Sequence, residues 1–150
     1  MKESQLGRFS GESDKEMHLA GILNYLREKH ATLKNDYKMP SGQGAEACGL
    51  IAANVAKMFV TMGEKPMLLG INPRKVAEGG RAGGESLEPR IYEGRVSWGG
   101  HVVCVNHDIV YDPMVGEPKG LSEYKETIFT EPVESEVLVS ADDIENFVNR

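Results

Sequence analysis

A cysteine stands at the start of an apolar stretch, in the run GQGAEACGLIAANVAKMF that ends at Phe59. A thiol attacks a carbonyl carbon only as its thiolate, and the unpaired N–H groups and dipole of a helix N-terminus lower the pKa of a thiol placed there. Cys48 falls in the first turn of the helix that we predict over residues 45–62, so it is a candidate nucleophile. A structural role is the competing interpretation, because free cysteines are among the most buried residues in proteins.

The run SWGGHVVCVNHDIVYDPM offers a histidine and an aspartate that could serve the same site. Two strand-like stretches flank the turn-forming residues 106–108, which predicts a β-hairpin. With the turn centred between Asn106 and His107, His101 falls opposite Asp112 on one face of the sheet, where a carboxylate can orient an imidazole. A one-residue shift of register would separate the two side chains. An ordinary hairpin with polar ends is the alternative.

Together, Cys48, His101 and Asp112 would supply a nucleophile, a base and a group that orients the base. Gln43, shortly before the cysteine, offers a side-chain amide that could donate a hydrogen bond to an oxyanion. A loop glutamine that faces water is the alternative for Gln43.

These residues resemble the papain-like cysteine hydrolases, a superfamily that broadly includes transglutaminase-like enzymes and bacterial protein-glutamine deamidases. Its members place a cysteine at the start of a central helix, an oxyanion donor just before it, and a histidine and then Asp or Asn on adjacent strands. The resemblance covers roughly residues 41–114. It implies Cys48 as nucleophile, Gln43 as oxyanion donor, His101 as base and Asp112 as orienter. The chain lacks the aromatic residue that usually follows the cysteine in secreted papain-type proteases, which favours a compact intracellular or effector-type member.

The resemblance implies a thiol-dependent amide hydrolase that acts on a protein or peptide through a cysteine thioester. Hydrolysis of a glutamine side chain would make it a deamidase, peptide cleavage a thiol protease, and resolution of the thioester by an amine a transglutaminase. The resemblance and the small size favour the deamidase. They also suggest a bacterial effector or toxin, with a host protein or a cognate inhibitor as a further partner. A non-catalytic binding module on the same fold is the alternative from another class.

The elements that must position these residues come as helices first and strands afterwards. Apolar residues on one face, after a capping-box spacing at Ser13 and Glu16, predict a helix over about residues 14–30. The helix over 45–62 is apolar nearly all round, which is typical of a buried central helix, and Gly63 would end it. Strand-like runs follow as KPMLLGI, RIYEGRVSW, HVVCV, IVYDP and SEVLVS, and the tail predicts a last helix. We therefore predict a papain-like α+β fold in which helices precede an antiparallel sheet.

A chain of 150 residues has the size of one domain. We predict a flexible lead-in over residues 1–12 and a single papain-like catalytic domain over residues 13–150. The glycine-rich stretch over residues 73–90 is longer than a typical connection, so we predict a mobile flap at the substrate entrance, or plain disorder.

Charge and hydropathy exclude several classes of partner. The formal net charge of −6 argues against a general electrostatic grip on nucleic acid or on anionic membranes. No apolar run reaches the length of a membrane span, and the N-terminus lacks the apolar core of a secretory signal peptide. We expect a cytoplasmic protein, or one exported by a leaderless route, without nucleic-acid or membrane partners.

No metal or other cofactor is expected. HVVCVNH has the spacing of a metal motif, but His101 and Cys104 would point to opposite faces of a strand, so three zinc ligands cannot converge. Cys104 is expected in the core instead. A metal held by Cys48, His101 and Asp112 is disfavoured because no further histidine or carboxylate lies near them in the sequence. The run GGRAGG lacks the Lys-Ser/Thr of a phosphate-binding loop.

Overall fold

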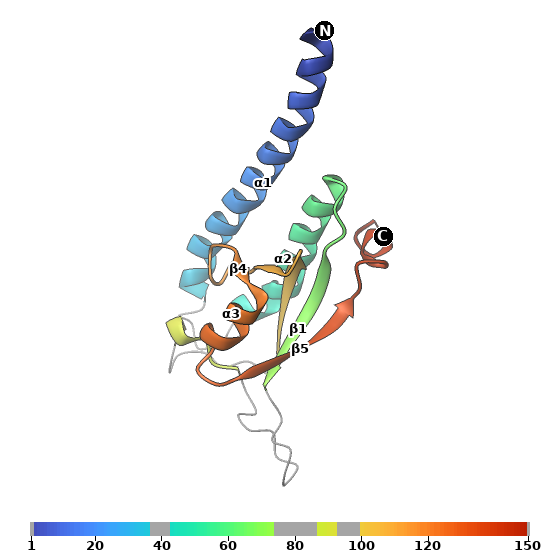
Figure 1. Cartoon of the computed structure of the whole chain (residues 1–150). Helices are drawn as coiled ribbons and strands as arrows, with labels where there is room; N and C mark the ends of the chain where they lie inside the picture. The colour runs from blue at the N-terminus through green and yellow to red at the C-terminus, as the bar shows by residue number, and fades with distance from the viewer. Residues whose placement is uncertain (1, 37–42, 74–86, 93–99, 150) are drawn as a thin grey trace.

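Two helices precede the sheet, as the sequence predicts. They are α1 (Lys2–Asp36) and α2 (Gln43–Thr61), and they pack side by side (Figure 1). The computed structural model describes residues 2–36, 43–73, 87–92 and 100–149; for residues 2–13, 34–36, 43–47 and 92 it describes the backbone alone. In the described part of the chain, none of the helices combines the length and the apolar character needed to cross a membrane.

The first helix is longer than predicted. Its backbone is helical from Lys2 onward, so residues 2–12 of the lead-in predicted over residues 1–12 are helical. No proline interrupts the sequence before Asp36, and a glycine inside a helix costs only about 1 kcal/mol. Local propensity therefore allows the helix to extend past the apolar face that predicted it. Among the described side chains of this helix, Ile22, Leu26 and Leu33 are buried.

The second helix is not buried on all sides. One face packs against the sheet and α1 through buried side chains, among them Ile51, Val55 and Phe59. The opposite face is open: Leu50 is 66% exposed, and Asn54 and Lys57 are exposed as well. The prediction of a helix buried all round is therefore wrong for this face, because the elements that pack against α2 leave one side of it uncovered.

The end of α2 has the predicted glycine. Gly63 adopts a φ of 85°, a left-handed conformation that glycine accepts without steric cost. The Glu64 N–H donates to the Phe59 carbonyl and the Gly63 N–H to the Val60 carbonyl, the two bonds of a Schellman motif. The helix therefore stops where the sequence indicates.

Five strands form one antiparallel sheet in the order β4-β3-β2-β1-β5. They are β1 (Met67–Pro73), β2 (His101–Asn106), β3 (Ile109–Tyr111), β4 (Lys119–Gly120) and β5 (Val133–Val139). Figure 1 shows β5 beside β1 at one edge of the sheet. The helix α2 packs on β2, and α3 (Leu121–Thr127) contacts β3, β4 and β5. The short helix α4 (Ile144–Val148) confirms the predicted C-terminal helix and packs against α2. The architecture is α+β, with helices before an antiparallel sheet.

The stretch predicted to be a flap has a packed end. Residues 74–86 lie outside the described residues, but Leu87 is only 2% exposed. Pro89 forms a β-bridge with Phe129, and the neighbouring backbone groups hydrogen-bond across the same two segments. The part of the predicted flap from Leu87 onward is therefore a structural element, held against the segment that follows α3.

One predicted strand is not a strand where the structure describes it. Arg90–Tyr92 form a short 3-10 helix, η1, at the beginning of the run RIYEGRVSW. The Arg90 N–H donates to the Ile128 carbonyl, which ties this turn to the end of α3 instead of to the sheet. The rest of the run, residues 93–98, lies outside the described residues.

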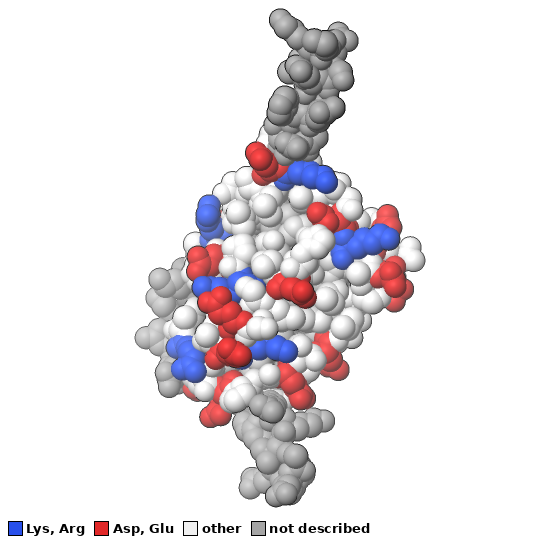
Figure 2. Space-filling model, viewed as in Figure 1, with Lys and Arg blue, Asp and Glu red and all other residues white. Residues whose placement is uncertain are grey.

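Acidic and basic side chains alternate on the surface. On the described part of the face in Figure 2, Lys and Arg are interspersed with Asp and Glu, and neither sign forms a continuous region.

Candidate active site

The hairpin of β2 and β3 turns one residue later than predicted. Its turn is His107–Asp108, with φ values of 52° and 62°, and the first pair beyond it is Asn106 with Ile109. Two successive left-handed residues are the geometry of a tight two-residue hairpin. The prediction that His101 lies directly opposite Asp112 is therefore wrong.

The later turn nevertheless keeps His101 and Asp112 on one face. Cys104 pairs with Tyr111. In the same register Asp112, which follows β3, lies opposite Val103 on β2. Val103 and His101 are two residues apart on one strand, and their side chains share a face. Diagonal neighbours on a face remain within reach of long side chains. The structure places His101 Nε2 2.9 Å from Asp112 Oδ2, with both side chains buried.

The Asp112 carboxylate is surrounded by donors. Its Oδ1 accepts the Met114 N–H at 2.9 Å, and its Oδ2 accepts the Tyr124 hydroxyl at 2.5 Å as well as His101 Nε2. Burial alone would raise the pKa of Asp112, but the charge of His101 and these hydrogen bonds bring that pKa below its usual value. Asp112 is therefore an anion at neutral pH.

Cys48 lies within hydrogen-bonding reach of the same imidazole. Its half-buried thiol interacts with the His101 ring, and each group shifts the pKa of the other. Asp112 binds the same ring at Nε2. A thiol, an imidazole and a carboxylate thus form one row, delivered by α2, by β2 and by the residue after β3.

The charges in this row stabilise one another. Burial would raise the pKa of Cys48, but the hydrogen bond and charge of His101, with a hydrogen bond from the Val102 backbone, lower it below its usual value. Burial would lower the pKa of His101, but the charge of Asp112 and the hydrogen bonds to Asp112 and Cys48 raise it to about 10. At neutral pH the His101 ring is therefore protonated, and its charge favours the thiolate form of Cys48.

The source of this activation differs from the prediction. The helix α2 begins at Gln43, earlier than predicted, so Cys48 lies beyond its first turn. The effect of the helix dipole fades within that turn. The lowered pKa of Cys48 comes from His101 and the Val102 N–H instead.

Two other sequence-based interpretations have different outcomes. Gln43 is the first residue of α2, but its side chain is outside the described residues, so its role as oxyanion donor stays a prediction. Cys104 is fully buried, as expected, and burial raises its pKa to about 12.

Two structural observations concern the residues of the metal interpretations. His107, the last residue of the HVVCVNH spacing, is exposed and pairs with Glu64 at 3.1 Å. Within the described ranges, no cluster of three or more His, Cys, Asp or Glu residues is arranged to hold a metal ion.

Sequence reasoning missed Tyr124, the third donor to Asp112. The segment LSEYKETIF has no clear periodicity in the sequence, and a tyrosine in it is an ordinary core residue. It also missed a contact from α1: His30 Nδ1 donates to the Pro113 carbonyl at 2.9 Å. This bond fixes the loop after Asp112 to the first helix.

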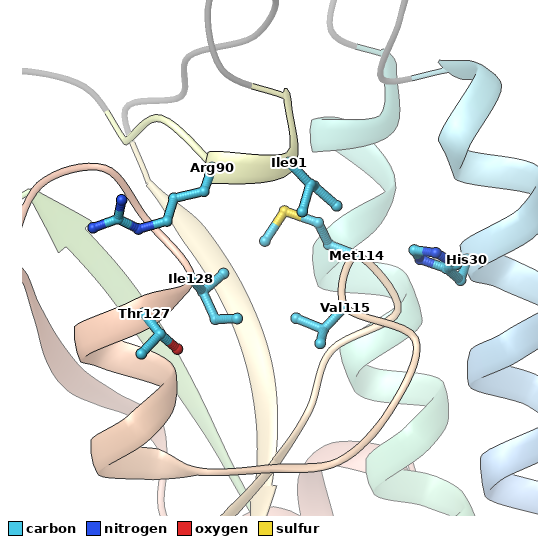
Figure 3. Close-up of a pocket in the computed structure, with 7 residues that line it drawn as sticks. All are labelled: His30, Arg90, Ile91, Met114, Val115, Thr127 and Ile128. Carbon is cyan, nitrogen blue, oxygen red and sulfur yellow. The ribbon is translucent and has the colours of Figure 1, made fainter.

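A cavity of about 430 Å³ lies next to this loop. Figure 3 shows the apolar side chains of Ile91, Met114, Val115 and Ile128 around it, with His30 at one side and the Arg90 guanidinium directed away. Met114, whose backbone N–H donates to Asp112, connects the cavity to the site. Cys48, His101 and Asp112 are not among the residues that line it.

Comparison of the chain with protein-family models, with curated proteins and with solved structures finds no match.

Proposed function

We propose that this protein is a cysteine hydrolase that cleaves amides through a thioester on Cys48. The observation that carries the proposal is the row of Cys48, His101 and Asp112, in which His101 binds the Asp112 carboxylate and lowers the pKa of the Cys48 thiol. A thiol of lowered pKa beside a base that is itself oriented by a third group is the arrangement that nucleophilic catalysis requires. A buried ion pair of this kind is costly to a structure, so a purely structural role for all three residues explains it less well.

Each residue has a defined role in the proposed reaction. The Cys48 thiolate attacks the carbonyl carbon of the amide, and a tetrahedral intermediate forms. His101 transfers its ring proton to the departing nitrogen, the C–N bond breaks and a thioester remains. Water then attacks the thioester while His101 accepts one of its protons, and Cys48 leaves as the thiolate. Asp112 holds the imidazole in place and stabilises its charged form throughout.

The proposed substrate is a protein or peptide amide. If the amide is a glutamine side chain, the products are glutamate and ammonia, and if it is a peptide bond, the chain is cut. Because the first half-reaction is common to both, the site geometry does not choose between them. The resemblance to papain-like hydrolases and the short chain favour the protein-glutamine deamidase, in the setting of a bacterial effector or toxin.

The test of this proposal is incubation of the wild-type protein with candidate protein substrates, followed by intact-mass and peptide mass spectrometry. A deamidation mass gain, a cleavage or a cross-link that the Cys48→Ser variant does not produce supports the proposal and identifies the reaction. Cys104→Ser is the matched control, because it removes the other thiol.

Iodoacetamide alkylation supplies a test that needs no substrate. The proposal expects Cys48 to react at mildly acidic pH, where an ordinary thiol with a pKa of about 8.5 is almost fully protonated. A Cys48 that reacts only at alkaline pH would contradict the proposal and favour a binding module on this fold.

A further inference from the structure

The hydroxyl of Tyr124 binds the carboxylate oxygen that also binds the proposed base. Tyr124 lies in α3 and is 0% exposed. Its hydroxyl donates to Asp112 Oδ2 at 2.5 Å, and His101 Nε2 donates to the same oxygen at 2.9 Å. The neutral Tyr124 hydroxyl and the His101 imidazole therefore donate to the same oxygen, Asp112 Oδ2.

We propose that Tyr124 is a positioning residue of the candidate active site, which fixes the Asp112 carboxylate and thereby controls how firmly His101 holds its ring proton. The significance of this role for catalysis rests on the proposed function. The physical effect on His101 does not, and it can be measured without a substrate.

The position of Asp112 in the fold explains why its carboxylate needs a positioning residue. β3 ends at Tyr111, so Asp112 follows the last paired residue of the hairpin. The Met114 N–H holds Oδ1 from the following turn, and Tyr124 holds Oδ2 from α3. With an oxygen anchored on each side, the carboxylate presents a fixed lone pair to His101. Without the hydroxyl, Oδ2 would keep His101 as its side-chain donor but lose the anchor to α3.

The same helix is also linked to the imidazole ring through an aromatic contact. The Tyr124 ring meets the Phe129 ring edge-on at a centroid distance of 5.8 Å, and Phe129 in turn lies edge-on to His101 at 6.4 Å. Phe129 is fixed by its β-bridge to Pro89. Packing against Phe129 therefore holds the Tyr124 ring in place, and the Tyr124 hydroxyl is directed at the Asp112 carboxylate.

The hydroxyl has an electrostatic effect as well as a steric one. A donor to a carboxylate withdraws part of its negative charge, so it weakens the attraction between the carboxylate and a neighbouring cation. Removal of the hydroxyl should raise the pKa of His101. A more acidic hydroxyl at the same place should donate more strongly and lower that pKa. A hydroxyl that served only to fill space would produce neither shift.

The experiment measures the pKa of the His101 ring by NMR in protein labelled with ¹⁵N-histidine. The His101 signals are assigned by their loss in a His101→Gln variant. Tyr124→Phe removes the hydroxyl and keeps the ring, and site-specific fluorotyrosine at position 124 makes the hydroxyl more acidic. Tyr111→Phe is the control, because Tyr111 is also a buried tyrosine and its ring packs against Phe59.

We expect the two changes at position 124 to shift the pKa of His101 in opposite directions. Tyr124→Phe should raise the pKa of His101 by about half a pH unit or more, fluorotyrosine should lower it, and Tyr111→Phe should leave it unchanged. An unchanged His101 pKa in a folded Tyr124→Phe protein would overturn the inference. If that variant does not fold, the fluorotyrosine protein decides, because it retains both the ring and the hydroxyl.

Failure of this inference is distinguishable from failure of the proposed function. A wild-type Cys48 that alkylates as an ordinary thiol would refute the hydrolase while leaving the His101 shifts measurable. A reactive Cys48 together with an unresponsive His101 would refute the role of Tyr124 alone.

Discussion

Cys48 and Cys104 are the two cysteines of the chain, and their surroundings move their pKa values in opposite directions. Burial raises the pKa of both thiols, and for Cys104 on β2 it does so to about 12. For Cys48 the charge of His101 and hydrogen bonds outweigh burial and bring the pKa below its usual value. The comparison shows that the pKa of a half-buried thiol in this protein is lowered by a charged partner, whereas burial without such a partner raises it.

The strand β2 explains why only one thiol gains this partner. His101 and Cys104 are both on β2, and an odd separation along a strand places two side chains on opposite faces. His101 therefore faces Asp112 and Cys48, while Cys104 pairs with Tyr111 on the other face. One short strand thus carries both the proposed base and an inert thiol.

The largest expected difference between the two cysteines is in turnover. Cys48→Ser should lower the rate of the proposed hydrolysis at least about 1,000-fold, because an alcohol is not ionised by an imidazolium neighbour. Cys104→Ser should stay within a few-fold of wild type. Both are measured by mass spectrometry of the substrate over time. Retention of more than about a tenth of the wild-type rate by Cys48→Ser would remove Cys48 from its role.

Loss of the charged partner should raise the pKa of Cys48 and make this thiol slow to alkylate, as is expected of Cys104. In His101→Gln, the pKa of Cys48 should rise toward or above the ordinary value of about 8.5, so its alkylation rate at pH 6 should fall about tenfold to a hundredfold. Iodoacetamide labelling followed by peptide mapping reports each thiol separately, and Cys104 should stay unlabelled in the folded protein. An unchanged rate for Cys48 at pH 6 would show that His101 does not activate it.

A smaller effect is expected when the imidazole remains but its anion is neutralised. Asp112 is the main cause that raises the pKa of His101 to about 10, so Asp112→Asn should lower that pKa by about 1–3 pH units. The proposed activity requires a protonated His101, so its upper limit of pH should move down by a similar amount. The measurement is the pH profile of turnover in wild type and variant. A profile that does not move would mean that Asp112 does not act on the charge of the ring.

The smallest effect concerns stability. Cys104→Ser buries a hydroxyl among apolar neighbours, which should lower the free energy of unfolding by about 1–3 kcal/mol. The exposed Leu50→Ala on the open face of α2 is the control, with an expected change within about 0.5 kcal/mol. Urea denaturation followed by circular dichroism measures both. A Cys104→Ser protein as stable as wild type would show that its site tolerates a polar group.

Much of the fold could be predicted from local sequence patterns. The helix α2, its end at Gly63 and the hairpin were predictable because each depends on near neighbours in sequence. The period of a strand also put His101 and Asp112 on one face, although the register was wrong. The turn type decides register, and the left-handed pair proved to be His107 and Asp108, one position after the pair that we expected.

Other features depend on contacts that no local pattern shows. The donor from Tyr124 to Asp112 depends on how α3 packs, and the run that contains it has no clear periodicity. The same holds for the bond from His30 to the Pro113 carbonyl, which joins α1 to a loop far along the chain. The activation of Cys48 was inferred from its helix but comes from His101, because the start of α2 lies earlier than local propensity indicated.

The order of these residues along the chain has a consequence for biosynthesis. Cys48 leaves the ribosome on the N-terminal half, whereas His101, Asp112 and Tyr124 follow on the C-terminal half. At usual translation rates several seconds separate them. During that interval the nascent chain carries a thiol without its imidazolium, and such a thiol is mostly protonated at neutral pH. The base and its carboxylate, eleven residues apart, can pair as soon as their hairpin closes. The proposed reactivity therefore requires the late hairpin to dock on the early helix, and a chain terminated before the hairpin would lack the group that lowers the pKa of Cys48.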